Sequence, residues 1–153
     1  MSNDPICTVD GSDAEMNAAI RLAQQTFPEF VREIELDSHR ILPALELAVL
    51  KAFFFEPATP ERGEHMFVDE IEVEGEMIHG TLRGTPQSVS GLTEGQRVSF
   101  SLAQLSDWFI VIGGRGRGGY TLDVIAKRMP PDLYREAATQ PPFSWFAGRQ
   151  EHS

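Results

Sequence analysis

Apolar residues near the start of the chain recur at helical spacing. Five of them form one stripe of an amphipathic helix: Met16, Ala19, Ile20, Ala23 and Phe27. Residues 12–15 have the S-x-x-E form of a capping box, which predicts that the helix begins there. Pro28 lacks a backbone donor and disfavours helix at the residue before it. We therefore expect the helix to stop or kink at Pro28, with a second short piece over residues 30–34.

The next apolar stretch, residues 45–55, predicts a buried strand. Periodicity alone does not separate a strand from a buried helix here, because almost every residue except Lys51 is apolar. The three consecutive phenylalanines at residues 53–55 favour the strand. Residues 57–63 contain two prolines and a glycine and predict a loop.

Strict alternation predicts a hairpin in the middle of the chain. Ile71 and Val73 alternate with acidic residues over residues 69–74, the pattern of a half-buried antiparallel strand. Gly75 supplies the turn, and residues 77–82 run back, with the numbers of paired residues adding to about 150. Residues 84–95 then predict a loop.

The last part of the chain predicts two more strands and short helices. The strands follow from two alternating sets: Val98, Phe100 and Leu102, then Trp108, Ile110 and Ile112. After a glycine-rich segment, residues 122–129 suit a short helix that two prolines end. Residues 132–139 predict one or two further helical turns, and residues 140–153 predict a loose tail.

This order of elements predicts an α+β domain. Short links and alternating patterns favour a curved antiparallel sheet of about five strands, small and partly open like a barrel. An N-terminal helix and short C-terminal helices would pack on it. We divide the 153 residues into a mobile N-terminal segment (1–12), a single α+β domain (13–130), and a C-terminal helical turn and tail (131–153).

The charge of the chain limits its partners. There are 23 Asp and Glu against 13 Lys and Arg, and the formal net charge is −10. This excludes nucleic acid as the expected partner, because phosphate binding depends on Lys and Arg. A basic protein would fit the charge. The simpler interpretation, which we prefer, is that the charge maintains solubility.

Composition also indicates a compartment. The single cysteine, Cys7, excludes an intrachain disulfide and fits a reducing environment. No run approaches the roughly 18 apolar residues that span a bilayer. The first residues carry Asp4 rather than a basic flank and an apolar core. We expect a cytoplasmic protein without membrane contact.

Five short motifs occur in order along the chain: residues 15–20, 64–68, 80–82 with Pro86, 106–108 and 118–121. In these motifs the chain resembles the YegJ-like bacterial family, a domain of unknown function, although it has Phe67 where that family often carries Trp. The resemblance implies a single bacterial domain and brings no established activity, cofactor or catalytic residue. The characteristic residues that it implies are His65, Asp107, Trp108, Gly118, Gly119, Tyr120 and Thr121.

The glycine-rich segment, residues 113–119, is the first candidate site. It contains G-x-G-x-x-G, yet a dinucleotide fingerprint also needs a βαβ unit and an acid at the end of the next strand. A Walker loop would have Lys where Tyr120 follows the last glycine. A weaker hypothesis is that backbone donors, Arg115 and Arg117 contact an anion. We prefer a mobile connector whose glycines permit positive φ.

A metal site shared by His65 and His79 is not expected. On the predicted register the two histidines lie about 20 Å apart along the hairpin. The glutamates at positions 70, 72 and 74 have the pattern of a solvated strand face. We predict neither a metal nor a cofactor.

Ser106, Asp107 and a histidine supply the residue types of nucleophilic catalysis, but no G-x-S-x-G elbow is present. The simpler interpretation is that the Asp107 carboxylate accepts backbone donors. Trp108 would then be a core anchor whose indole N–H is hydrogen-bonded. The competing hypothesis is a buried His65–Asp107 pair with a shifted pKa.

Three aromatics lie in the otherwise polar tail: Phe143, Trp145 and Phe146. They either pack back on the domain, which we favour, or form a contact surface. The charge, the small β pattern and the lack of a complete catalytic motif favour a non-enzymatic binding domain that engages a basic protein partner. The alternative is a small enzyme or small-anion-binding protein built around His65, Asp107 and the glycine-rich segment.

Overall fold

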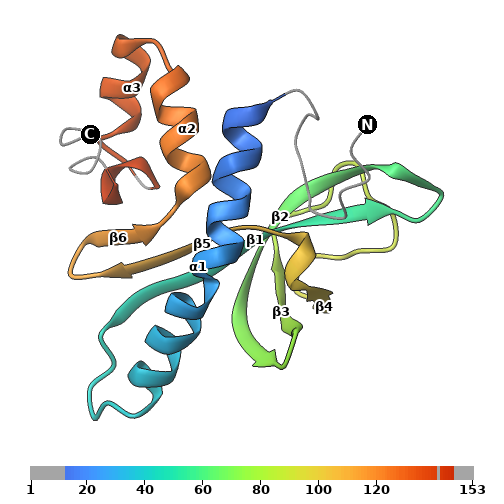
Figure 1. Cartoon of the computed structure of the whole chain (residues 1–153), viewed down its shortest axis with the longest axis horizontal. Helices are drawn as coiled ribbons and strands as arrows, with labels where there is room; N and C mark the ends of the chain where they lie inside the picture. Colours follow the sequence, from blue (N-terminus) through green and yellow to red (C-terminus); the bar gives the residue numbers. More distant parts are fainter. Residues whose placement is uncertain (1–12, 141, 147–153) are drawn as a thin grey trace.

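The computed structural model describes residues 13–140 and 142–146 and has the α+β fold that the sequence predicts (Figure 1). A long helix is followed by a sheet and by short C-terminal helices. The elements are α1 (Ala14–Ser38), β1 (Leu45–Glu56), β2 (Thr59–Glu74), β3 (Met77–Arg83), β4 (Arg97–Ser101), η1 (Leu102–Gln104), β5 (Leu105–Ile112), β6 (Arg115–Gly118), α2 (Tyr120–Arg128), α3 (Pro131–Ala137) and η2 (Phe143–Trp145).

The strands form one antiparallel sheet of six strands in the order β4-β3-β2-β1-β5-β6. β4 and β6 are its edges, so the sheet is open and is not closed into a barrel. Figure 1 shows α1 crossing in front of the sheet, with α2 and α3 beside one another above β6. The fold therefore has one strand more than the sequence predicted.

The N-cap of α1 is Asp13. Its carboxylate accepts a hydrogen bond from the Met16 backbone N–H at 3.0 Å. A side-chain oxygen at this position satisfies one of the backbone donors that have no partner within the helix. Ser12, the predicted start of the capping box, lies outside the described residues.

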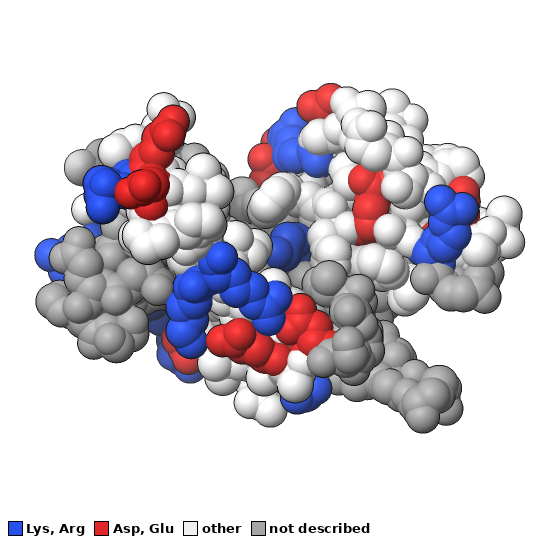
Figure 2. Space-filling view, turned by 90° about the horizontal axis from the view of Figure 1, so that it is seen from above, with Lys and Arg blue, Asp and Glu red and all other residues white. Residues whose placement is uncertain are grey.

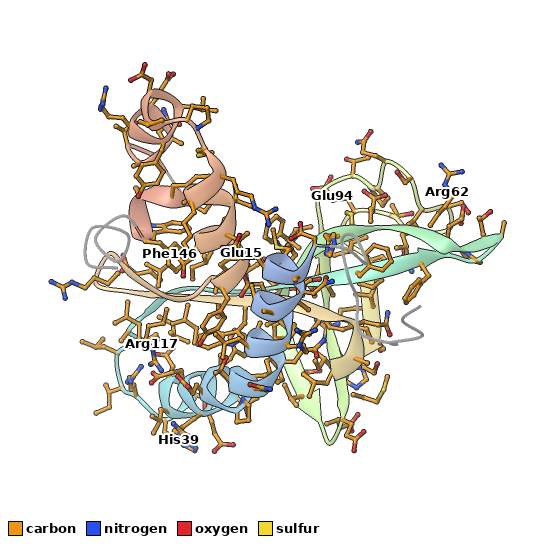
Figure 3. All side chains as sticks on the ribbon, turned by 45° about the horizontal axis from the view of Figure 1, so that its top comes forward. Glu15, His39, Arg62, Glu94, Arg117 and Phe146 are labelled. Carbon is orange, nitrogen blue, oxygen red and sulfur yellow. The ribbon has the colours of Figure 1, made fainter. Side chains whose placement is uncertain are left out.

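Pro28 does not end α1, so of the two outcomes predicted there, a stop or a kink, the stop is wrong. Figure 3 shows that α1 changes direction part-way along its length. The helix runs on for 25 residues to Ser38. Phe27 and Phe30, on either side of the proline, are both buried in the core. Their packing outweighs the cost of about 3 kcal/mol that a proline brings to a helix interior. In the part of the chain that the structure describes, no helix has the length and apolar character needed to cross a bilayer.

The predicted loop at residues 57–63 is mostly strand. A turn of two residues joins β1 to β2, because Glu56 pairs with Thr59. Gly63 therefore lies inside β2 opposite Phe55, where a side chain would collide with the Phe53 ring. Here the glycine marks the close approach of the neighbouring strand and not a loop.

The β2–β3 hairpin has the predicted turn at Gly75, but its register shifts near that turn. Asp69 pairs with Thr81, as predicted, whereas His79 pairs with Glu72 and not with Ile71. The shift is a bulge at Glu70, which adopts a φ of 52°. Regular alternation in the sequence could not reveal this extra residue.

The glycine-rich segment is a hairpin and not a connector. Gly113 and Gly114 form its turn with φ values of 59° and 76°. β6 then pairs with β5, from Arg115 opposite Ile112 to Gly118 opposite Phe109. The residues of β6 show no strand pattern, because arginine alternates with glycine instead of polar with apolar residues.

The first face of the sheet, under α1, carries the main core. Phe27 and Phe30 of α1 pack there in one cluster with strand residues such as Leu50, Val68 and Trp108. A stripe of apolar residues on α1 therefore meets the apolar alternation of the strands.

The second face, which we define as the sheet face turned away from α1, is covered by α2 and the residues that follow. Phe109 of β5 packs there with Leu122 and Phe146, and Val49 of β1 lies against them. β1 is therefore apolar on both faces, which explains why its sequence shows no alternation.

The C-terminal aromatics pack back on the domain, as predicted. The rings of Phe146 and Phe109 meet edge to face at 6.2 Å, and Phe143 and Trp145 pack around them. Figure 3 shows Phe146 between the C-terminal helices and the sheet. Residues 142–146 are thus not the loose tail that the sequence predicted, and residues 147–153 lie outside the described part of the chain.

Candidate functional site

A polar cluster lies on the second face, and a bulge in β5 produces it. Lys51 pairs with Asp107 while the next residue of β1, Ala52, pairs with Leu105, so Ser106 is the extra residue. Successive strand residues normally point to opposite faces, but a bulge changes the direction of one of them. Ser106 and Asp107 therefore both reach side chains on the Lys51 side of the sheet.

The Asp107 carboxylate caps the start of α2. It accepts hydrogen bonds from the backbone N–H of Tyr120 at 3.1 Å and of Thr121 at 2.7 Å, and from the Thr121 hydroxyl at 2.5 Å. The Trp108 N–H donates to it as well, at 2.9 Å. A carboxylate at this position satisfies unpaired helix donors and interacts favourably with the helix dipole. Asp107 thus has the capping role that the sequence favoured.

Lys51 extends this arrangement into the central strand of the sheet. Its Nζ donates to the Thr121 hydroxyl oxygen at 2.8 Å. Asp107 is 0% exposed and Thr121 is 1% exposed. Burial raises the pKa of Asp107, while the Thr121 hydrogen bond and the positive charge of Lys51 act in the opposite direction. The hydrogen bonds and the nearby ammonium offset part of the cost of burying this carboxylate.

His65 joins the cluster from β2. Its Nδ1 lies 2.7 Å from the Ser106 hydroxyl, and its ring meets the Phe53 ring edge to face at 5.0 Å. Burial, with a contribution from the charge of Lys51, lowers the pKa of His65 to about 4. The imidazole is therefore neutral at neutral pH. His65 and Asp107 belong to one cluster, in which His65 bonds Ser106 and Asp107 bonds the start of α2.

Trp108 anchors the opposite side of the same strand in the core. It is 1% exposed, and its indole N–H donates to the Thr26 hydroxyl at 3.0 Å. Its ring meets Phe30 and Tyr120 edge to face. This agrees with the core-anchor interpretation.

Gly118 and Gly119 have backbone roles. Gly118 has a φ of 80°, and a side chain there would collide with the backbone and ring of Trp108. Gly119 is the N-cap of α2 with a φ of 66°, and its N–H donates to the Trp108 carbonyl at 2.8 Å. Positive φ and close approach both favour glycine. Most of the residues implied by the family resemblance are therefore ones that join β5 to α2.

The two arginines of the glycine-rich hairpin do not converge. Arg117 forms ion pairs with Glu33 at 2.8 Å and Glu29 at 3.0 Å on α1. Arg115 is exposed beside the turn. Gly116 lies against the Phe146 ring, where a side chain would not fit. The contacts of Arg117 fasten β6 to α1, and anion contact by Arg115 and Arg117 stays a prediction.

Among the described residues, no group of three or more His, Cys, Asp and Glu could hold a metal ion. His79 bonds the Ser99 hydroxyl at 2.7 Å and Glu74 at 3.0 Å. His65 pairs with Phe53 of β1 in the sheet, whereas His79 pairs with Ser99 of β4.

An apolar groove of about 350 Å³ lies beside the polar cluster on the second face. Its sides come from two parts of the fold, the sheet and the C-terminal segments. The sheet contributes Leu47, Val49, Phe67, Arg83 and Phe109, and the C-terminal segments contribute Leu122, Pro142 and Trp145. In the space-filling view the surface is hollowed between the C-terminal helices on the left and the strands on the right (Figure 2).

The groove and the role of Lys51 were not predicted from the sequence. Two signals were present: an isolated lysine in an apolar strand, and a strand that is apolar at both alternate positions. An apolar strand without alternation indicates that both of its faces are covered. The identity of the cover could not be inferred, because it comes from residues about 75 to 95 positions further along the chain.

The fold and the site define a small α+β domain with a helix on one face of an open antiparallel sheet and a groove on the other. The chain belongs to the family described as "Uncharacterized protein conserved in bacteria (DUF2314)", which matches residues 13–140. The prediction of an uncharacterised bacterial family is thereby confirmed, whereas the resemblance to the YegJ-like family stays a prediction.

The chain is also similar to a protein of Neisseria meningitidis serogroup B that bears the name "Putative ankyrin repeat protein". The two are 32% identical over 130 residues, which cover 84% of this chain and 51% of the Neisseria protein. The chain thus spans about half the length of this relative. No solved structure matches the chain.

Proposed function

We propose that this chain is a non-enzymatic, cytoplasmic binding domain and that the groove on its second face holds part of a protein partner. The groove is the observation that carries the proposal. It is lined almost entirely by apolar side chains, and one of them, Phe67, is 47% exposed. Exposed apolar surfaces of this kind commonly mark binding sites. Aromatic residues such as Phe67 and Trp145 are also enriched in protein interfaces.

The polar cluster supports a structural role more strongly than catalysis. A catalytic base or nucleophile has to approach the reacting atom to about 3 Å. Ser106 and Asp107 are both 0% exposed, so an external substrate would not reach them in the folded chain. Their hydrogen bonds instead hold α2 on the sheet, and α2 supplies Leu122 to the groove.

The Neisseria relative also supports a binding function. Its name refers to ankyrin repeats, a class of solenoid whose extended surfaces bind other molecules. The part of that protein similar to this chain is about half of it. A binding domain next to a second binding region would increase avidity for one assembly. Kinship with the YegJ-like proteins stays a prediction.

Site-specific photocrosslinking tests the proposal. A photoreactive benzoylphenylalanine placed at position 67 in the native bacterium should give a discrete crosslinked protein. Leu22 on α1 is the matched control, because it is 42% exposed and lies on the other side of the molecule from the groove.

The control position should give no such product. Absence of a discrete product from position 67, or the same product from both positions, would contradict the proposed function.

A further inference from the structure

We infer that the occupant of the groove is a segment of a partner protein with large apolar side chains in its middle and a lysine or arginine towards each end. This inference rests on the proposed function and adds the chemistry of the partner. It follows from a second hollow that adjoins the groove and from the charges at the outer ends of the two hollows.

A second hollow lies beside α3, next to the groove. The two hollows share Pro142, and the second is lined by Leu133, Phe143 and Ala137 among others. Its volume is about 320 Å³, and Leu133 is 52% exposed. We call the two adjoining hollows together the strip; it runs from Phe67 on β2 to Leu133 on α3 and is mostly apolar. Two adjoining hollows suit a segment with two or more apolar side chains better than a single small molecule.

The β2 end of the strip has an excess of negative charge. Arg83 lines the groove, and its Nε donates to Asp69 at 2.7 Å, while Glu70 lies 3.7 Å from its Nη2. Arg97 brings a second guanidinium, whose Nη1 donates to the Glu70 carbonyl at 2.8 Å and whose Nη2 lies 3.2 Å from Glu72. Three carboxylates therefore accompany two guanidinium groups. The Glu70 side chain is 65% exposed, so it is accessible to a cation from outside.

The α3 end has the same excess. Glu136 lines the second hollow and is exposed. Asp132 and Arg135 form an ion pair at 3.3 Å on the same helix. Two carboxylates here accompany one guanidinium, so among the residues that the structure describes each end of the strip has one negative charge in excess. Basic residues at both ends of a bound segment would complement this pattern.

The same charges disfavour a second copy of this chain as the occupant. Each copy has a formal net charge of −10. Self-association through the strip would bring acidic ends towards an acidic partner, and like charges brought together at an interface oppose binding.

Selection from a random peptide library tests the inference. Phage carrying random 12-residue peptides are selected on the full-length protein, and the enriched peptides are synthesised for affinity measurement. We expect enriched sequences with two or more large apolar residues flanked on both sides by Lys or Arg. Phe67→Ser should weaken the binding of these peptides by roughly tenfold or more, because it removes a large exposed apolar contact of the groove.

Charge reversal tests the two ends. The double variant Glu70→Lys with Glu136→Lys should weaken binding by about three- to tenfold, and the loss should shrink at high salt. The matched control is Glu35→Lys with Glu76→Lys, two exposed glutamates on α1 and in the β2–β3 turn. It changes the net charge equally and should leave the affinity unchanged.

Three results would overturn the inference. Enriched peptides without basic flanks, or with acidic ones, would show that the charges at the ends do not select the partner. Equal losses in the two double variants would show an effect of net charge alone. A dimer in light scattering that Phe67→Ser converts to a monomer would identify a second copy as the occupant. In each case a crosslinked protein from position 67 would leave the proposed function standing, and its absence would contradict that function separately.

Discussion

The buried carboxylate of Asp107 accepts hydrogen bonds from three backbone amides and one hydroxyl. It connects residues of β5 and α2 that are 14 positions apart in the chain. A group of this kind contributes to stability mainly because its donors would otherwise be buried without partners. The contribution of the Asp107 carboxylate to the free energy of unfolding can therefore be measured without any ligand.

We expect Asp107→Asn to lower the free energy of unfolding by about 2 kcal/mol. The amide retains the shape of the carboxylate but loses the charge near Lys51, and its NH₂ group faces at least one donor. Urea denaturation with an unchanged m-value would measure the loss. Asp132→Asn is the control, because that side chain is 93% exposed and should change stability by less than about 0.5 kcal/mol. Equal losses in both variants would contradict the capping role.

His65 should make stability depend on pH. Its pKa is about 4 in the folded chain against its usual 6.5. Between these values the unfolded chain binds a proton that the folded chain does not, so unfolding becomes easier as the pH falls from 6.5 towards 4. Asp107 acts in the opposite direction, because burial raises its pKa and the folded chain then takes up the proton first.

His65→Gln isolates this contribution, since glutamine does not titrate and can still bond Ser106. The free energy of unfolding of the variant, measured by urea denaturation at pH 7 and pH 4.5, should fall less than that of the wild type. His79→Gln is the matched control, because His79 also bonds a serine hydroxyl, that of Ser99. If the free energy of unfolding of His65→Gln fell as steeply between pH 7 and pH 4.5 as that of the wild type, burial of His65 would not control its protonation.

At the scale of elements, apolar periodicity predicted helices and strands correctly where their packing follows the local sequence pattern. The stripe through Ile20 and Phe27 indicated α1, and the alternation of Ile71 and Val73 indicated the hairpin with its turn at Gly75. The predictions failed where tertiary contacts outweigh local preference. Aromatic packing carries α1 past Pro28, and pairing with β5 converts a glycine-rich stretch into β6. Neither contact leaves a local signal in the sequence.

We therefore expect Pro28 to lower the free energy of unfolding by a measurable amount. Pro28→Ala restores a backbone donor in an exposed part of the helix, and we expect the free energy of unfolding to rise by about 1 to 3 kcal/mol. Urea denaturation measures this change. Gln25→Ala, at another exposed position of α1, should stay within about 0.5 kcal/mol of the wild type. A loss of stability in Pro28→Ala would mean that the packing of Phe27 and Phe30 needs a bend at the proline.

At the scale of the whole molecule, the groove exists only in the folded chain. Leu47 and Trp145 line the same space although almost one hundred residues separate them. Sequence motifs identified the join between β5 and α2, because those residues lie close together in the chain. The groove has no such motif. Apart from Arg83, its members are ordinary apolar residues, which pack against the core and also line the groove.

The hydrogen bond between Lys51 and Thr121 has a consequence for how this surface would be mapped. One side of the groove belongs to the sheet and the other to α2 and the residues after it. The distance between the sides depends on the contacts that hold α2 in place, none of which needs to touch a partner. A mutational screen scored only by loss of binding would assign Asp107 to the interface, from which it is shielded. Measuring stability beside affinity for every variant would separate residues that hold the groove open from residues that contact the partner.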